Sequence, residues 1–290
     1  TAINRADLMQ RAGAYPPPPG ASPILGLECA GVVEQVGTGV SGLAPGDRVC
    51  ALLTGGGYAE EVVVPAAQVL PIPSSMSFTD AAALPEVFAT AYLNLYMEAA
   101  LKPGETVLLH AGASGVGTAA IQLCKAFDNP CYVTAGSDDK ISRCVEMGAA
   151  AGANRHAGSF TEHVKDWTDG HGFDVILDPV GAGYFEANVS SLNLDGRLVL
   201  IGLMGGVQTN LSLAPMLMKR LRIIGSTLRA RSIAAKGVLM QTLHERVWPL
   251  LESGEIVPIV ETVIPVAEAA RAHALVASDK TFGKVILEIS

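Results

Sequence analysis

The pattern of apolar and polar residues changes part-way along the chain. As far as about residue 84, short apolar runs are separated by Gly, Pro and charged residues, which is typical of a β-rich, irregular fold. The segments Gly26–Gly37 and Tyr58–Val64 each predict a strand, and the turn at Pro45–Val49 leads into another. The four prolines of Tyr15–Gly20 predict a stiff loop that packs through its apolar flanks.

Beyond residue 78 the pattern is that of alternating helices and strands. Helix is predicted over Thr79–Met97, with a break at Pro85. Strands are then predicted at 106–110, 131–135, 173–178, 197–202 and 222–226, and helices near 115–127, 139–148, 160–168, 183–192 and 212–220. After about residue 228 the pattern predicts a helix (235–252) and two short strands (262–264 and 284–288). The predicted fold class is therefore α/β, a doubly wound parallel sheet of the Rossmann type inserted between two parts of a β-rich domain.

A glycine-rich turn stands between the first of these strands and its helix. Gly112, Gly115 and Gly117 in the segment Thr106–Thr118 allow a tight turn and a close approach of the backbone to a pyrophosphate at the helix N-terminus. The spacing is G-x-x-G-x-G, whereas the commoner dinucleotide motif is G-x-G-x-x-G. The following strand ends at the distance of roughly 20 residues at which a dinucleotide ribose is bound. Dinucleotide binding is favoured over a glycine turn that binds no ligand.

Composition excludes several classes of protein. The chain has 290 residues, of which 49% are hydrophobic and 17% charged, and its net charge is −8. Two domains are expected from this length, and nucleic acid is disfavoured as the main partner because no basic cluster is present. The uncharged segment Thr106–Cys124 is interrupted by glycines and polar residues, so it predicts a strand, turn and buried helix, and no membrane partner is expected.

The chain opens at Thr1 as if in mid-domain, which leads us to expect residues upstream.

Cysteines and histidines give no sign of a metal centre. The five cysteines form no C-x-x-C pair, and the six histidines are scattered without an H-E-x-x-H motif. Buried thiols in a reducing, cytoplasmic environment are expected rather than disulfides. No Ser/His/Asp or Cys/His constellation is evident either, so a bound cofactor is expected to carry the chemistry.

Several motifs together are similar to a known family. They are Asn4–Gln10, Tyr15–Gly20, Gly26–Glu28, Ala111–Gly117, Thr134–Ser137 and Gly202–Gly206. They resemble the NADPH quinone oxidoreductase branch (zeta-crystallin relatives) of the medium-chain dehydrogenase/reductase superfamily, over essentially the whole chain. The resemblance implies a GroES-like catalytic domain (1–86 and 229–290, N-terminally incomplete), a Rossmann domain (87–228) and hydride transfer from NADPH to quinones.

The resemblance also bears on zinc. Zinc-dependent members of the superfamily carry a Gly-His-Glu ligand motif, whereas this chain has Gly26-Leu27-Glu28, and Leu cannot bind a metal. The four-cysteine structural lobe of those members is missing as well. A zinc-independent enzyme is expected, and without a Lewis acid an easily reduced quinone or another activated conjugated carbonyl is the better acceptor.

The cofactor contacts are expected in two groups. The pyrophosphate is assigned to Gly112, Ser114, Gly115, Val116 and Gly117. A 2′-phosphate is assigned to Ser137 and Lys140, because an NAD site would have an acidic residue at this strand end. The neighbouring Asp138 and Asp139 oppose that assignment unless they face solvent. Arg155 is expected either to pair with the phosphate or to be a surface charge.

The nicotinamide and the acceptor are assigned by resemblance. The nicotinamide residues are Thr90, Gly202, Leu203, Met204, Thr227, Leu228 and Arg229. Asn4 and Tyr15 of the other domain are expected to bind the acceptor, and Tyr15 also the cofactor. A Thr90 hydroxyl bonded to its own helix, and a Tyr15 that only packs against the prolines, are the alternatives. The residues identify no protein acid.

The sequence leaves two alternative functions open, and it also bears on the oligomeric state. An NADPH-dependent enoyl-thioester reductase shares this fold, and a non-catalytic, crystallin-like NADPH-binding protein is a third possibility. The resemblance implies a homodimer, and the apolar segment Arg222–Ser226 is expected to form it as the open edge strand of the sheet.

Overall fold

The protein, a computed structural model in which residues 1–289 are described, divides into two compact units. The first unit comprises residues 1–89 and 228–290, and the second comprises residues 90–227. Helix α3 (Pro85–Tyr92) carries the chain from the first unit to the second. It continues as a π-helical turn over Leu93–Glu98.

The second unit is built on a six-stranded parallel sheet with the order β6-β5-β4-β7-β8-β9. Its strands are β4 (Val107–Leu109), β5 (Cys131–Ala135), β6 (Ala151–Asn154), β7 (Phe173–Asp178), β8 (Leu192–Leu200) and β9 (Arg222–Gly225). All three residues of β4 are buried, as expected of a strand covered on both faces. The order reverses between β4 and β7, and such a switch point is where α/β sheets bind ligands. The predicted Rossmann-type sheet is confirmed.

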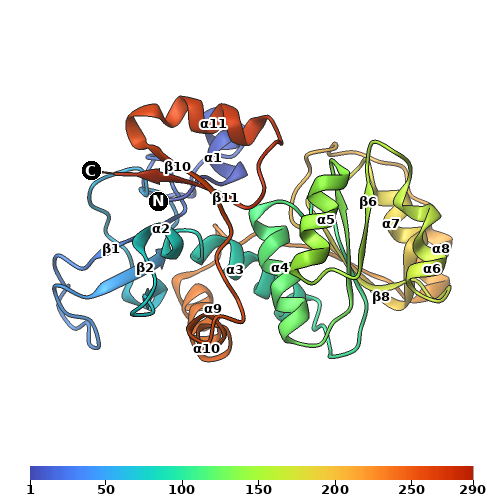
Figure 1. Cartoon of the computed structure of the whole chain (residues 1–290), viewed down its shortest axis with the longest axis horizontal. Coiled ribbons are helices and arrows are strands. Elements are labelled where there is room, and N and C mark those ends of the chain that lie inside the picture. Colours follow the sequence, from blue (N-terminus) through green and yellow to red (C-terminus); the bar gives the residue numbers. More distant parts are fainter. Residues whose placement is uncertain (290) are drawn as a thin grey trace. The chain divides into compact units, whose positions relative to one another are not determined.

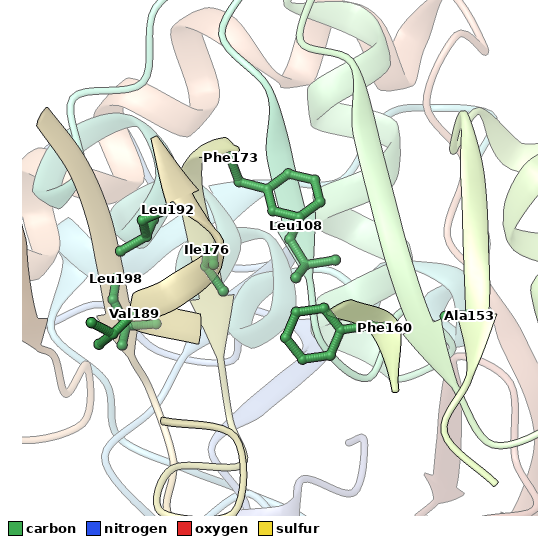
Figure 2. Packing of buried hydrophobic residues seen from close by; sticks show 8 residues of the cluster. All are labelled: Leu108, Ala153, Phe160, Phe173, Ile176, Val189, Leu192 and Leu198. Carbon is green, nitrogen blue, oxygen red and sulfur yellow. The ribbon is translucent and has the colours of Figure 1, made fainter. Parts of the chain in front are cut away.

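Helices cover both faces of this sheet. Helices α4 (Gly115–Ala126) and α5 (Asp138–Met147) lie on one side, and α6 (Val164–Trp167), α7 (Phe185–Ser191) and α8 (Leu213–Lys219) on the other (Figure 1). A single-turn helix at Phe160–Glu162 precedes α6. Leu108, Phe160 and Phe173 meet in the core beneath α6 to α8, with Ile176 and Leu198 beside them (Figure 2).

The first unit holds two small sheets. Strands β1 (Glu28–Val32), β2 (Arg48–Leu52) and β3 (Val69–Pro71) are antiparallel, and β10 (Val260–Pro265) pairs in parallel with β11 (Lys284–Glu288). The helices are α1 (Arg5–Arg11), α2 (Phe78–Ala81), α9 (Ile233–Arg246), α10 (Trp248–Glu252) and α11 (Ala269–Ala277), with single turns at Ala66–Gln68 and Val266–Glu268. Helix α11 lies beside α1 (Figure 1).

Two local predictions for the first unit were wrong, and two of its helices were missed. Tyr58–Val64 forms no strand: within the described chain no strand pairs with it, and the Val63 side chain is fully exposed at 102%. The short helices α1 and α11 were not predicted, because α1 spans only two turns and α11 is rich in alanine. The predicted helix over 235–252 is two helices, since the chain breaks at Val247 and Pro249 stands in the first turn of α10.

Candidate functional site

The glycine turn lies at the carboxyl end of β4, at the switch point of the sheet. The N–H of His110 donates to Leu177 O of β7, and the N–H of Gly112 donates to Thr134 O of β5, so the turn is tied to both neighbouring strands. Helix α4 begins immediately afterwards, with the Ser114 hydroxyl accepting a hydrogen bond from the N–H of Gly117 at 3.0 Å.

Two of the glycines are required by close packing. A Cβ on Gly117 would lie 2.5 Å from the carbonyl oxygens of Ala111 and Gly112, and one on Gly112 would lie 2.7 Å from the Val133 side chain. The N–H groups of Gly115 and Val116, in the first turn of α4, have no acceptor inside the helix. Together with the helix dipole they form an anion-binding end of the kind that holds a pyrophosphate.

The carboxyl ends of β5 and β6 bring the second group of predicted residues together. Ser137 caps α5 by accepting a hydrogen bond from the N–H of Lys140 at 3.3 Å. Arg155, which follows β6, extends across the end of β5, because a Cβ on Gly136 would lie 3.4 Å from its Nη2. Asp138 accepts a hydrogen bond from Asn154 Nδ2 at 2.9 Å, which draws its carboxylate toward β6. A cation therefore stands at the strand end where an NAD-specific site would have an acid.

A pocket of about 220 Å³ opens beside Arg155 in the second unit. It is lined by Thr134, Ala153, Arg155, Gly158, Ser159, Phe160, Gly183, Tyr184 and Ala187. Arg155 is near enough to Tyr184 to oppose the rise that burial causes in the pKa of this phenol. The pocket thus combines an aromatic wall with a cation.

A buried polar network, which the sequence did not reveal, runs behind this pocket. His110 Nδ1 lies 3.0 Å from Thr134 Oγ1, His110 Nε2 lies 2.7 Å from Asn188 Oδ1, and Asn188 Nδ2 donates to Asp178 at 2.9 Å. Because Asn188 Oδ1 can only accept, Nε2 of His110 carries the proton and Nδ1 accepts from Thr134. Burial lowers the pKa of His110 to about 4, so the ring is neutral at pH 7.

The network ends at the loop assigned to the nicotinamide. Asp178 accepts hydrogen bonds from the N–H groups of Val180 and Gly181. The N–H of Met204 then donates to Pro179 O at 3.2 Å, and that of Gly205 to Val180 O at 2.7 Å. The segment Gly202–Met204 is therefore fixed at the carboxyl edge of the sheet, next to the end of β7.

Thr90 and Thr227 mark the two ends of the second unit. Within the described residues the Thr90 hydroxyl makes no hydrogen bond, so it does not bond back to its own helix; the Thr90 carbonyl accepts from Asn94 Nδ2 at 2.7 Å. Thr227 follows β9 and precedes Leu228, which is buried in the first unit.

In the first unit Asn4 is held by two charged residues. Its Nδ2 donates to Glu28 Oε1 at 2.8 Å, and its Oδ1 accepts from Lys284 Nζ at 2.7 Å. Lys284 also forms a buried ion pair with Glu28 at 2.8 Å and donates to Ile3 O at 2.9 Å. The Asn4 amide, which is predicted to face the acceptor, is therefore held in one orientation by Glu28 and Lys284.

The Tyr15 ring lies under the guanidinium of Arg229, which is itself held by hydrogen bonds. The guanidinium of Arg229 stands 5.4 Å from the centre of the Tyr15 ring. It donates to Thr54 O at 2.8 Å and to Gln10 Oε1 at 2.7 Å. Packing and a position facing a ligand are both compatible with this arrangement of Tyr15, whose phenol is half-buried.

Comparison with known proteins gives a consistent picture. Residues 115–244 match the zinc-binding dehydrogenase family, and residues 1–74 match the alcohol dehydrogenase GroES-like domain. A quinone oxidoreductase-like protein 2 homolog of Nematostella vectensis is 31% identical, with 98% of this chain and 78% of the relative aligned. The Escherichia coli quinone oxidoreductase complexed with NADPH has a TM-score of 0.86 at 30% identity, covering 99% of this chain and 88% of that one. The CurK enoyl reductase has a TM-score of 0.86 at 27% identity, covering 100% and 88%.

The chain belongs to the quinone oxidoreductase-like family of medium-chain dehydrogenases/reductases. It is an oxidoreductase domain related both to quinone oxidoreductases and to enoyl reductases. The N-terminal match confirms that residues 1–74 form a GroES-like domain. Within residues 1–289, no helix combines the length and the apolar character needed to cross a membrane.

Although the family model is named for zinc, the residues that the structure describes at the ligand motif do not fit the metal. Leu27 precedes Glu28 in the ligand motif, and the Glu28 carboxylate is occupied by Lys284 and Asn4. Within the described residues no three His, Cys, Asp or Glu side chains are close enough together to bind an ion.

Proposed function

We propose that this medium-chain reductase transfers a hydride from NADPH to quinones or similar activated carbonyl acceptors without zinc. The observation that carries the proposal is the Asn4–Glu28–Lys284 cluster. It fills the ligand motif of zinc-dependent relatives with an ion pair, so the acceptor has to be reducible without a Lewis acid. The quinone oxidoreductase neighbours support this choice of acceptor.

In this proposal NADPH, when bound, supplies the hydride, and the protein positions it. The first N–H groups of α4 hold the pyrophosphate, and Arg155 with Ser137 holds the 2′-phosphate. The segment Gly202–Met204, fixed through Asp178 and the neutral His110, supports the nicotinamide. A similarity to CurK enoyl reductase favours enoyl thioesters as the second candidate acceptor.

The test is a steady-state assay with NADPH against a quinone series and an enoyl-thioester series. We expect a higher kcat/KM for the quinones, which need no long carrier group. A preference for enoyl thioesters would replace the first acceptor by the second. Binding of NADPH with no turnover of either class would instead indicate a non-catalytic, crystallin-like protein.

NADPH is expected to be preferred over NADH by about tenfold to hundredfold in kcat/KM, because a charge-assisted contact contributes roughly 1.5–3 kcal/mol. Arg155, whose guanidinium crosses the end of β5, is expected to account for most of the preference, and Lys140 for less. The measurement is kcat/KM for both cofactors in wild type, Arg155→Ala and Lys140→Ala. Arg143→Ala, on the same helix as Lys140, is the control. An unchanged ratio in both variants would show that the 2′-phosphate binds elsewhere.

A homodimer is expected through β9, which lies at the open edge of the six-stranded sheet. The preceding helix α8 exposes Leu213, Leu217 and Met218, with Leu217 at 79%, and such an apolar edge is usually covered by a partner. Light scattering at micromolar concentration should give twice the chain mass for wild type and for Val145→Glu on α5. Leu217→Glu should shift the protein toward the monomer. A monomeric wild type would contradict the expectation.

A further inference from the structure

The first unit contains a pocket of about 570 Å³ whose lining includes Arg229, a residue assigned above to the nicotinamide. It is bounded by the proline loop 18–22, the segment 53–56 after β2, residues 61–65, and residues 229–236 at the start of α9. Its walls are largely aliphatic, formed by residues such as Pro18, Ile24 and Val62. A volume of this size accommodates a ring-sized organic molecule.

One buried cation lines this pocket. Lys236, in the first turns of α9, is only 2% exposed, and its Nζ donates to Thr54 Oγ1 at 2.7 Å. An ammonium has three N–H donors, yet among the described residues Thr54 is its one acceptor and no carboxylate lies within ion-pair distance. A buried charge with a single neutral partner destabilises a fold, so folding gives no reason for this arrangement.

The groups around Lys236 leave its charge available. Arg229, which also lines the pocket, already donates to Thr54 O and Gln10 Oε1. The Glu86 carboxyl on α3 is near enough to act on Lys236 electrostatically, although it makes no ion pair with it. Burial lowers the pKa of Lys236, and Glu86 opposes this change.

We propose that Lys236 is the catalytic electrophile: in this pocket its ammonium hydrogen-bonds the acceptor oxygen on which negative charge develops during reduction. The inference rests on the proposed function, since it names the group that takes the place of the missing Lewis acid. A preorganised donor in a poorly solvated pocket stabilises such charge far more than water does.

The step balances without any further reagent. NADPH, when bound, would supply the hydride, which carries two electrons and one proton, and its addition converts the quinone into the hydroquinone monoanion. Lys236 keeps its proton and donates an N–H to the negative oxygen. On release the anion takes one proton from water, which completes the hydroquinone.

The first test measures binding without catalysis. The probe is 4-nitrophenol, whose phenolate is a ring-sized mimic of the hydroquinone monoanion and whose ionisation is followed by absorbance. Wild type is expected to bind the phenolate at least tenfold more tightly than Lys236→Met does, and to lower the pKa of the bound phenol. Lys280→Met, which removes an exposed lysine of the same unit, should behave as wild type. Equal affinity in wild type and Lys236→Met would overturn the proposal.

The second test measures turnover and stability. Lys236→Met should lower kcat for quinone reduction roughly 100-fold, while the Kd for NADPH measured by fluorescence stays unchanged. The variant should unfold at the same or a higher urea concentration than wild type, because it removes an under-paired buried charge. A fully active Lys236→Met enzyme, or a loss of activity that merely follows a loss of stability, would overturn the proposal.

The two tests separate this inference from the proposed function. If wild type reduces no quinone but binds the phenolate through Lys236, the quinone reductase proposal fails and the anion-binding pocket stands. If wild type reduces quinones and Lys236→Met does so equally well, the reductase proposal stands and the role of Lys236 is wrong.

Discussion

Replacing Lys284 with Met is expected to lower the free energy of unfolding by about 3–5 kcal/mol, the usual cost of removing one partner of a buried ion pair. Lys284 and Glu28 are 2.8 Å apart and almost fully buried. The substitution leaves the Glu28 carboxylate without its counter-ion and deprives Asn4 Oδ1 of its donor. Urea denaturation followed by circular dichroism measures the loss.

A double-mutant cycle shows whether the loss comes from the pair. Glu28→Gln alone should destabilise by a similar amount, because it leaves the Lys284 ammonium unpaired. The double variant should be more stable than the sum of the single losses predicts, since it leaves no unpaired charge. The exposed pair Arg220–Asp195 is the control, and Arg220→Met should leave the unfolding midpoint unchanged. Additive losses in the Glu28 and Lys284 variants would contradict this view of the cluster.

Glu86→Gln is expected to change how stability depends on pH. Burial, and then the neighbouring Glu28 carboxylate, raises the pKa of Glu86 from its usual 4.5 to about 8. The folded protein therefore binds a proton that the unfolded chain releases near pH 4.5. This contribution to stability is complete below pH 4.5 and is lost as the pH rises through 8.

The measurement is the free energy of unfolding of wild type and Glu86→Gln at pH 5 and pH 8. Between pH 5 and pH 8 the free energy of unfolding of the Gln variant should rise by roughly 2–4 kcal/mol relative to that of wild type. One pKa unit corresponds to about 1.4 kcal/mol. Glu34→Gln, the same change at an exposed position, controls for the removal of one carboxylate. A stability difference that stays constant between pH 5 and pH 8 would show that Glu86 is ionised throughout.

The sequence predicted the second unit well, apart from the missed strand β6, because its elements are encoded locally. Buried parallel strands are short apolar runs such as Val107–Leu109, and each helix start carries its own signal, as Ser114 and Ser137 do by capping α4 and α5. The glycine turn was equally readable, since Gly112 and Gly117 are required by contacts within the strand–turn–helix unit itself or with the adjacent strand. The first unit was predicted less well: the alternating pattern of Tyr58–Val64 has no partner strand to bond with.

The tertiary structure decided which partners the charged groups contact. Lys236 meets Thr54 across 182 positions, and Lys284 meets Asn4 across 280. A lysine on a helix or strand has the same local pattern whether it reaches solvent or a buried carboxylate, so no window of sequence distinguishes the two. By itself the sequence determined the sheet, the glycine turn and the absence of a histidine beside Glu28. Only the packing of distant segments decided which carboxyl has a raised pKa and which ammonium is paired with a carboxylate, because desolvation and Coulomb energies depend on three-dimensional distance.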